Sequence, residues 1–244
     1  MYGWRGKFGF VTPSISDTVL MEFYRMLPEG VLVTTVDLKI QNLVDEEFGE
    51  AMDKIDEAVK ILDYEEVEAI IVGGTPPITK MGFDAESKII DGVQSATGKP
   101  ASTTPTAEVG AMKALGLKRI GFVSPYQEPL HRHLEAYLEH AGFEVIVSRG
   151  LDIVKNVHLT QQNFHRAYMV AKEAFLEVDG EVDGLFITCP RWPVVRCIDA
   201  LERDLGVPVV SSAQALVWKA LSMLNIREVR AGYGKLFAGF EAEV

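Results

Sequence analysis

The sequence predicts an α/β protein of two pseudo-symmetric lobes, each a parallel sheet flanked by helices. Two observations predict this fold. Short apolar runs bounded by glycine and proline alternate with longer amphipathic runs, which is typical of parallel strands covered by helices. The chain also repeats itself: Gly9–Pro13 (GFVTP) returns as Gly121–Pro125 (GFVSP), and Gly98–Pro100 (GKP) returns as Gly206–Pro208 (GVP).

We predict parallel strands at the short apolar runs, because strands buried on both faces are apolar throughout. In chain order these runs are Phe8–Val11, Leu32–Leu38, Ala69–Val72, Ile120–Val123, Glu144–Val147, Gly184–Thr188 and Val207–Val210. Helices are predicted where apolar residues recur at helical spacing. They cover Phe48–Asp63, Leu130–Ala141, Phe164–Leu176 and a segment near Val194–Asp204.

The repeat also predicts two domains. We expect the first lobe at residues 6–105 and the second at 106–210, with residues 211–244 packing back on the first. In open parallel sheets, ligands bind outside the carboxyl ends of the strands. The loops that follow the strands should therefore line one cleft between the lobes, which is the expected active site. These loops are residues 12–16, 73–77, 124–127 and 189–192.

Composition argues against several classes of protein. Of 244 residues, 35 are acidic and 24 basic, and the net charge of −11 argues against a nucleic-acid or anionic-membrane partner. No apolar run approaches the roughly 20 residues of a membrane helix, and two cysteines make no disulfide framework, so we expect a cytoplasmic protein. Dinucleotide, P-loop and metal-ligand motifs are absent from the sequence, and we expect no cofactor and no metal. The oligomeric state stays open, a homo-oligomer being one alternative.

Cys189 is the sharpest candidate for chemistry. It follows the strand Gly184–Thr188 directly and precedes Pro190 and a helix. N–H groups near the start of a helix favour a thiolate, although a thiol that only packs is the alternative. Cys197 shares the apolar stripe of the following helix and is predicted to be a core residue.

Two hydroxyl residues lie in matching loops of the two halves. Beside Gly74, Thr75 can donate to a ligand that approaches the backbone closely, or it can merely cap the next helix. Tyr126 can donate to an anion, or it can be an ordinary surface residue. The five histidines have no site-forming spacing, and most are predicted to be solvated.

Together these segments resemble the aspartate/glutamate racemase superfamily, especially its arylmalonate decarboxylase and maleate cis-trans isomerase branch. The resemblance covers nearly the whole chain. It is strongest at Gly74-Thr75, at Ser124–Tyr126 and in the stretch that runs from Cys189 through Leu205–Ser212 to Gly232–Phe237. It implies cofactor-independent proton chemistry next to a carboxylate, with a small carboxylate as substrate.

The resemblance also implies roles for single residues. Racemases and isomerases of this superfamily carry one cysteine from each lobe, whereas here Gly74 occupies the first-lobe position. A single second-lobe cysteine is similar to arylmalonate decarboxylase and implies Cys189 as the one proton donor that decarboxylation needs. Thr75 and Tyr126 match the family's hydroxyl donors to an enediolate, and Gly74 would leave room for a substituent.

Further positions of the resemblance are expected to contact substrate. Pro76 and Pro190 stand where the decarboxylase pattern has serine and glycine, whose N–H groups would bind the anion, and proline has no N–H. Asn156 looks like an asparagine of the isomerase branch. Ser14 and Ser16 fall in the loop where isomerases place substrate-binding polar residues.

The residues after Pro190 extend this site. Arg191 can anchor a carboxylate and Trp192 can form an aromatic wall, or they can face solvent and core. We expect a decarboxylase of a small aryl- or alkylmalonate that acts through an enediolate. The alternatives are a cis-trans isomerase or racemase of a small dicarboxylate, and a carboxylate-binding protein without catalysis.

Overall fold

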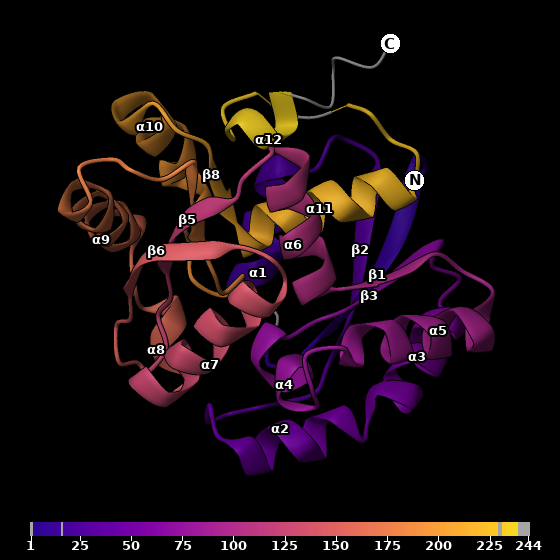
Figure 1. Ribbon diagram of the computed structural model, residues 1–244. Helices are drawn as coiled ribbons and strands as arrows, with labels where there is room; N and C mark the ends of the chain where they lie inside the picture. The colour runs from indigo at the N-terminus through magenta and orange to yellow at the C-terminus, as the bar shows by residue number, and fades with distance from the viewer. Residues whose placement is uncertain (1, 16, 229–230, 239–244) are drawn as a thin grey trace.

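The described residues form two four-stranded parallel sheets with the same strand order (Figure 1). The structure is a computed structural model that describes residues 2–15, 17–228 and 231–238. One sheet has the order β2-β1-β3-β4 and the other β6-β5-β7-β8. Their strands are β1 (Gly6–Thr12), β2 (Val31–Asp37), β3 (Ala69–Val72), β4 (Ala101–Thr103), β5 (Arg119–Val123), β6 (Glu144–Arg149), β7 (Gly184–Ile187) and β8 (Val209–Ser211). The predicted fold class of two similar α/β lobes is confirmed.

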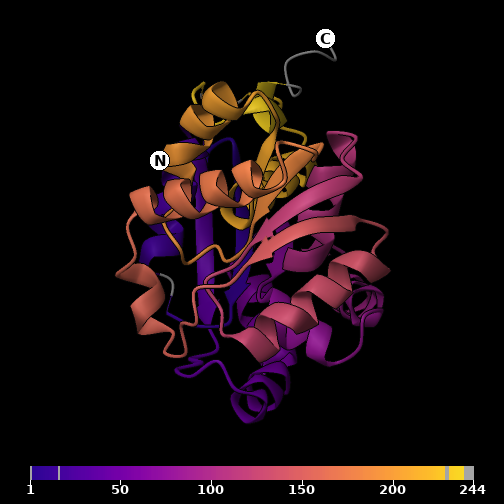
Figure 2. The same cartoon turned by 60° about the vertical axis from the view of Figure 1, so that its left-hand side comes forward.

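Helices flank both sheets (Figure 2). The first half contains α1 (Asp17–Met26), α2 (Asp45–Met52), α3 (Ile55–Tyr64), α4 (Thr75–Lys80), α5 (Ala85–Thr97) and α6 (Thr104–Ala114). The second half contains α7 (Glu128–His140), α8 (Val157–Thr160), α9 (Phe164–Glu177), α10 (Val195–Leu205), α11 (Ser212–Met223) and α12 (Lys235–Ala238). In the part of the chain described here, no helix is both long enough and apolar enough to cross a membrane.

Two elements differ from their prediction. The single helix expected at Phe48–Asp63 is two helices, because the chain turns at Asp53 and Lys54. The turn lets α2 pack against α4 while α3 packs against β1, β2 and α5. The strand β4 was not predicted, because it is three residues long and two of them, Ser102 and Thr103, carry hydroxyls. Most other strand ends differ by one or two residues.

The helices that follow the fourth strands join the two halves. Both helices begin with a hydroxyl cap: Thr103 accepts from the N–H of Thr106 at 3.2 Å, and Ser211 accepts from that of Gln214 at 3.3 Å. Helices α6 and α11 pack against each other, with the Trp218 ring beside Gly110. The helix after the fourth strand of each sheet therefore packs against the other lobe.

The C-terminal elements contact both halves. Helix α11 packs against α1 and β3 as well as α6. In contrast, α12 lies beside α10, where the N–H of Lys235 donates to Glu202 Oε2 at 2.8 Å. The domain boundaries at 105/106 and 210/211 stay a prediction.

Candidate active site

The loops after β1, β3 and β7 meet the Tyr126 loop after β5 around a small cavity of about 40 Å³. Seven of the nine predicted site residues line it: Ser14, Gly74, Thr75, Pro76, Tyr126, Asn156 and Pro190. The wall also contains Arg191 and the apolar side chains of Val19, Ile40, Leu43, Phe48 and Leu159. Ser16 lies outside the described residues.

A larger open groove, of about 780 Å³, lies between α3 and α5. None of the residues that line it is Cys, His, Ser, Thr or Tyr. The groove therefore lacks the nucleophiles and hydroxyl donors of the interlobe cavity. We take the smaller cavity as the candidate active site, because the side chains able to do chemistry converge there.

Cys189 is the one described site residue that does not line this cavity; it is buried beside the lining residues Pro190 and Tyr126, in a strained backbone conformation. Its φ of +85° is in the left-handed region, which a residue with a Cβ seldom adopts. The turn is held by the N–H of Cys189, which donates to Ser212 Oγ at 2.8 Å, and by the N–H of Trp192, which donates to the Cys189 carbonyl at 3.1 Å. Such strain costs about 1–3 kcal/mol and concentrates at functional sites.

Burial raises the pKa of the Cys189 thiol. Hydrogen bonds from the Tyr126 hydroxyl and from the N–H groups of Arg191 and Trp192 offset this only in part. A raised pKa favours the protonated thiol at neutral pH, the form that the expected role of Cys189 as proton donor needs. Helix α10 does not lower this pKa, because it begins six residues later and the N–H groups of Val194 and Val195 already donate to Glu22 at 2.9 Å.

Tyr126 comes from the second lobe and reaches the sulfur directly. Its hydroxyl hydrogen-bonds to Cys189, and burial raises the pKa of Tyr126 well above its usual value. Its loop is held by Ser124, whose Oγ accepts from the Tyr126 N–H at 3.3 Å and lies 2.7 Å from His131 Nδ1. His131 is buried and stacks on Phe122, so it is an exception to the prediction that most histidines are solvated.

Sequence reasoning missed Glu108, which lies behind the cavity on α6. Thr75 Oγ1 donates to its Oε2 at 2.7 Å, while Ser212 Oγ and Thr188 Oγ1 donate to its Oε1. Burial raises the pKa of Glu108 to about 7, although these hydrogen bonds act to lower it. The sequence does contain a signal for this residue. The repeat that aligns Thr104 with Ser212 also aligns Glu108 with Leu216. A carboxyl group therefore occupies the position that a core leucine has in the other half.

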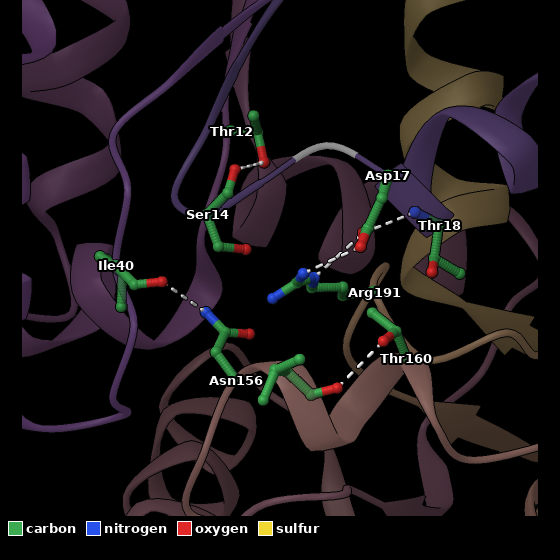
Figure 3. Close-up of polar contacts among 9 residues, drawn as sticks. Thr12, Ser14, Asp17, Thr18, Ile40, Asn156, Thr160 and Arg191 are labelled. Carbon is green, nitrogen blue, oxygen red and sulfur yellow. Dashed lines mark hydrogen bonds and ion pairs between the residues drawn. The ribbon is translucent and has the colours of Figure 1, made fainter.

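A second polar group lines the other side of the cavity (Figure 3). Arg191 is buried and pairs with Asp17 of α1, with Nη2 3.1 Å from Oδ2 and Nε 3.3 Å from Oδ1. The side chains of Ser14, Asn156 and Arg191 point toward one another. Asn156 is held by its Nδ2, which donates to the Ile40 carbonyl at 3.1 Å across the two lobes. These groups can bind a carboxylate through a guanidinium and an amide.

Gly74, Pro76 and Pro190 shape the cavity and offer no hydrogen-bond donor to a ligand. Gly74 has φ +104°, and its N–H donates to Thr104 Oγ1 at 3.1 Å. Pro76 lies in the first turn of α4, where a missing N–H leaves no helix bond unmade, and with Pro190 it gives the cavity an apolar wall. Trp192 is fully buried in the core and does not line the cavity.

Two further predictions concern thiols and metals. Cys197 is buried as predicted, and its Sγ donates to the Val194 carbonyl at 3.1 Å. Among the described residues, no group of three or more His, Cys, Asp or Glu side chains is placed to hold a metal ion.

This two-lobe fold, with Thr75 from the first lobe and Tyr126 from the second lining one cavity beside the Cys189 thiol, matches known proteins. The arylmalonate decarboxylase family profile matches residues 8–237. The chain belongs to the arylmalonate decarboxylase family. Arylmalonate decarboxylase from Bordetella bronchiseptica is 24% identical over 230 residues, which cover 94% of this chain and 95% of that protein.

Solved structures of both branches share the family fold. A mutant of arylmalonate decarboxylase in its liganded form has a TM-score of 0.90 at 22% identity and covers 96% of this chain and 99% of its own. The maleate isomerase Iso from Pseudomonas putida S16 has a TM-score of 0.89 at 22% identity, with the same coverage. The resemblance to this branch is thus confirmed, and its relatives are enzymes of two kinds, decarboxylases and cis-trans isomerases.

Proposed function

We propose that this member of the arylmalonate decarboxylase family is a cofactor-independent carboxy-lyase that acts on a small malonate-type acid. The observation that carries the proposal is the thiol of Cys189, which is buried beside the cavity, hydrogen-bonded to Tyr126 and raised in pKa by burial, while Gly74 occupies the equivalent turn of the first lobe. Proton removal and return on opposite faces of a carbon needs two acid/base groups, whereas decarboxylation needs one donor.

The reaction follows from these groups. The bond between the central carbon and one carboxylate breaks, CO₂ leaves, and the electron pair enters an enediolate. The S–H bond of Cys189 then breaks as a C–H bond forms, and the thiolate recovers a proton from water. Thr75 and Tyr126 are the hydroxyls placed to stabilise the enediolate, a role worth about 10²–10³ in rate for one donor elsewhere.

The walls of the cavity favour loss of CO₂. Ile40, Leu43 and Phe48 make part of the lining apolar, and an apolar surrounding destabilises a carboxylate relative to neutral CO₂. The cavity, of about 40 Å³, is small, so a small substituent on the substrate is favoured over a large one.

One observation favours a maleate-type isomerase as the second candidate. The guanidinium of Arg191 would stabilise a carboxylate that stays on the substrate, as both carboxylates do in cis-trans isomerisation. In that reaction the sulfur of Cys189 would add to the double bond, and rotation and elimination would follow. The raised pKa of Cys189 opposes this route, because the thiolate is the nucleophile.

The test is a comparison of products from two substrate sets. Purified protein is incubated with alkyl- and arylmalonates and separately with maleate, while CO₂ and fumarate are measured. C189A is the test variant, and C197A is the control, because the Cys197 thiol is buried on α10 and donates to the Val194 carbonyl instead of contacting Tyr126. CO₂ release that C189A abolishes and C197A retains supports the lyase. Fumarate formation supports the isomerase, and thermal stabilisation by these acids without any product supports a binding protein.

A further inference from the structure

Glu108 faces hydroxyl groups from both halves of the molecule, and its two oxygens differ in their partners. Oε2 has the Thr75 hydroxyl at 2.7 Å. Oε1 has two donors, the hydroxyls of Ser212 and Thr188. Glu108 is 1% exposed, so water does not substitute for any of these groups.

The protonation state of this carboxyl decides where the Thr75 hydrogen points. A carboxylate only accepts hydrogen bonds, so ionised Glu108 draws the hydrogens of all three hydroxyls toward itself. Thr75 then presents only lone pairs to the cavity, and lone pairs repel an anion. A protonated carboxyl donates instead. Its proton belongs on Oε2, because Oε1 already accepts from two hydroxyls.

We propose that Glu108 is a positioning residue that, as a neutral acid, turns the Thr75 hydroxyl toward the cavity and so creates an anion donor. Its Oε2–H donates to Thr75 Oγ1, which leaves the Thr75 hydrogen free for a carboxylate or an enediolate. The inference rests on the proposed function only for the part that concerns turnover. Anion binding tests it separately.

The pKa of Glu108, about 7 because of burial, places this change within the range where enzymes work. The titratable groups that influence Glu108 or lie beside its partners come from several elements. Those nearby are Glu86 of α5, Tyr137 of α7, Tyr126 after β5 and Cys189 after β7. Four elements pack against α6, and two of them carry a lysine. Lys80 of α4 pairs with Asp45, and Lys219 of α11 is half-buried. The strands β4 and β8 carry no charged residue. No cation is among the groups that shift the pKa of Glu108, so no positive charge offsets the effect of burial.

The test measures how the dissociation constant of propionate depends on pH. Propionate is a suitable probe because it stays ionised between pH 6 and 8. We expect wild-type affinity to fall about tenfold as the pH rises from about 6 to about 8, because the neutral fraction of a group with a pKa of about 7 falls by that factor. E108Q is neutral at every pH and keeps a side-chain donor, so its affinity should change less than threefold. An equal fall in E108Q would overturn the proposal.

T75V separates this role from a simple charge effect and needs no change at Glu108. If Glu108 acts through the Thr75 hydroxyl, T75V binds propionate weakly at both pH values and shows no slope. If T75V keeps the tenfold slope, Glu108 acts by its own charge and the proposal is wrong. If the proposal is right, adding E108Q to T75V should not change the affinity for propionate any further, because in a double-mutant cycle both substitutions remove the same interaction.

Turnover provides the second readout, in wild type and E108Q. With a malonate that the enzyme decarboxylates, wild-type kcat/KM should fall near pH 7, while E108Q should lose that limb and keep activity at pH 8. A limb at the same pH in E108Q would contradict the proposal. Absence of any turnover would reject the proposed function and leave the propionate result to decide the role of Glu108.

Discussion

Cys189 occupies in the second lobe the position that Gly74 occupies in the first. Both residues are left-handed, with φ of +85° and +104°, and both follow a central strand of their sheet. The N–H of Cys189 donates to Ser212 Oγ at 2.8 Å, and that of Gly74 donates to Thr104 Oγ1 at 3.1 Å. The duplicated fold therefore presents two equivalent turns to one cleft, and only one of them carries a thiol.

G74C should restore a thiol on each face at a cost in stability. A Cβ at Gly74 would lie 2.6 Å from Pro77 Cγ, and the positive φ adds strain, so we expect a loss of about 1–3 kcal/mol. A chiral decarboxylation product should then lose optical purity, measured by chiral chromatography. G74A is the matched control, because it carries the same strain without a thiol. An optically pure product from folded G74C would count against the geometry.

C189G and C189A should both be inactive but differ in stability. Glycine accepts φ +85° without strain, whereas alanine does not. We therefore expect C189G to be more stable than C189A by about 1 kcal/mol, measured by urea unfolding. Equal stability would show that the turn at Cys189 stores no strain.

Y126F should slow turnover and raise the pKa of Cys189 further. The Tyr126 hydroxyl is one of the groups that holds this pKa down and one of the two proposed donors to the enediolate. We expect a loss of about 10²–10³ in kcat, as for the removal of other oxyanion donors. The pH dependence of thiol alkylation reports the pKa. A faster reaction of Y126F at neutral pH would contradict the prediction.

R191Q should weaken binding of dicarboxylates more than binding of propionate. A buried guanidinium paired with Asp17 is a strong carboxylate partner, and its loss should raise the dissociation constant of malonate about ten- to hundredfold. D17N is the control, since it keeps the guanidinium and removes only its partner. Equal dissociation constants of malonate for R191Q and wild type would show that Arg191 pairs with Asp17 and does not contact the ligand.

The stability of the protein should fall with rising pH because of Glu108. Its pKa is about 7 when folded and 4.5 in the absence of burial, so the folded state holds a proton that the unfolded state loses between these values. The contribution is fully present below pH 4.5 and is lost by about pH 7. Its size is on the order of 3 kcal/mol. Urea unfolding at pH 5 and pH 8 should show this drop in wild type and a smaller one in E108Q.

Most strands and the loops of the site could be predicted from the sequence. Apolar runs such as Ala69–Val72 and Gly184–Thr188 are local patterns, and the repeat places their loops at the same edge. The short β4 was missed because Ser102 and Thr103 do not look buried, yet both are. The repeat marks Glu108 as unusual, but its role was missed because its partners Thr75, Thr188 and Ser212 lie on other elements.

The sequence by itself determined the two-lobe fold and the loops that carry Cys189, Thr75 and Tyr126, because periodicity and repeated motifs can be read along the chain. The family followed from the resemblance of these motifs to a known family. Only the tertiary structure decided the protonation of Cys189 and the partners of Glu108 and Arg191. Glu108 meets Ser212 and Arg191 meets Asp17 across 104 and 174 residues of chain. Such contacts depend on how the two lobes pack, and burial between them sets the pKa values, so no local pattern encodes either.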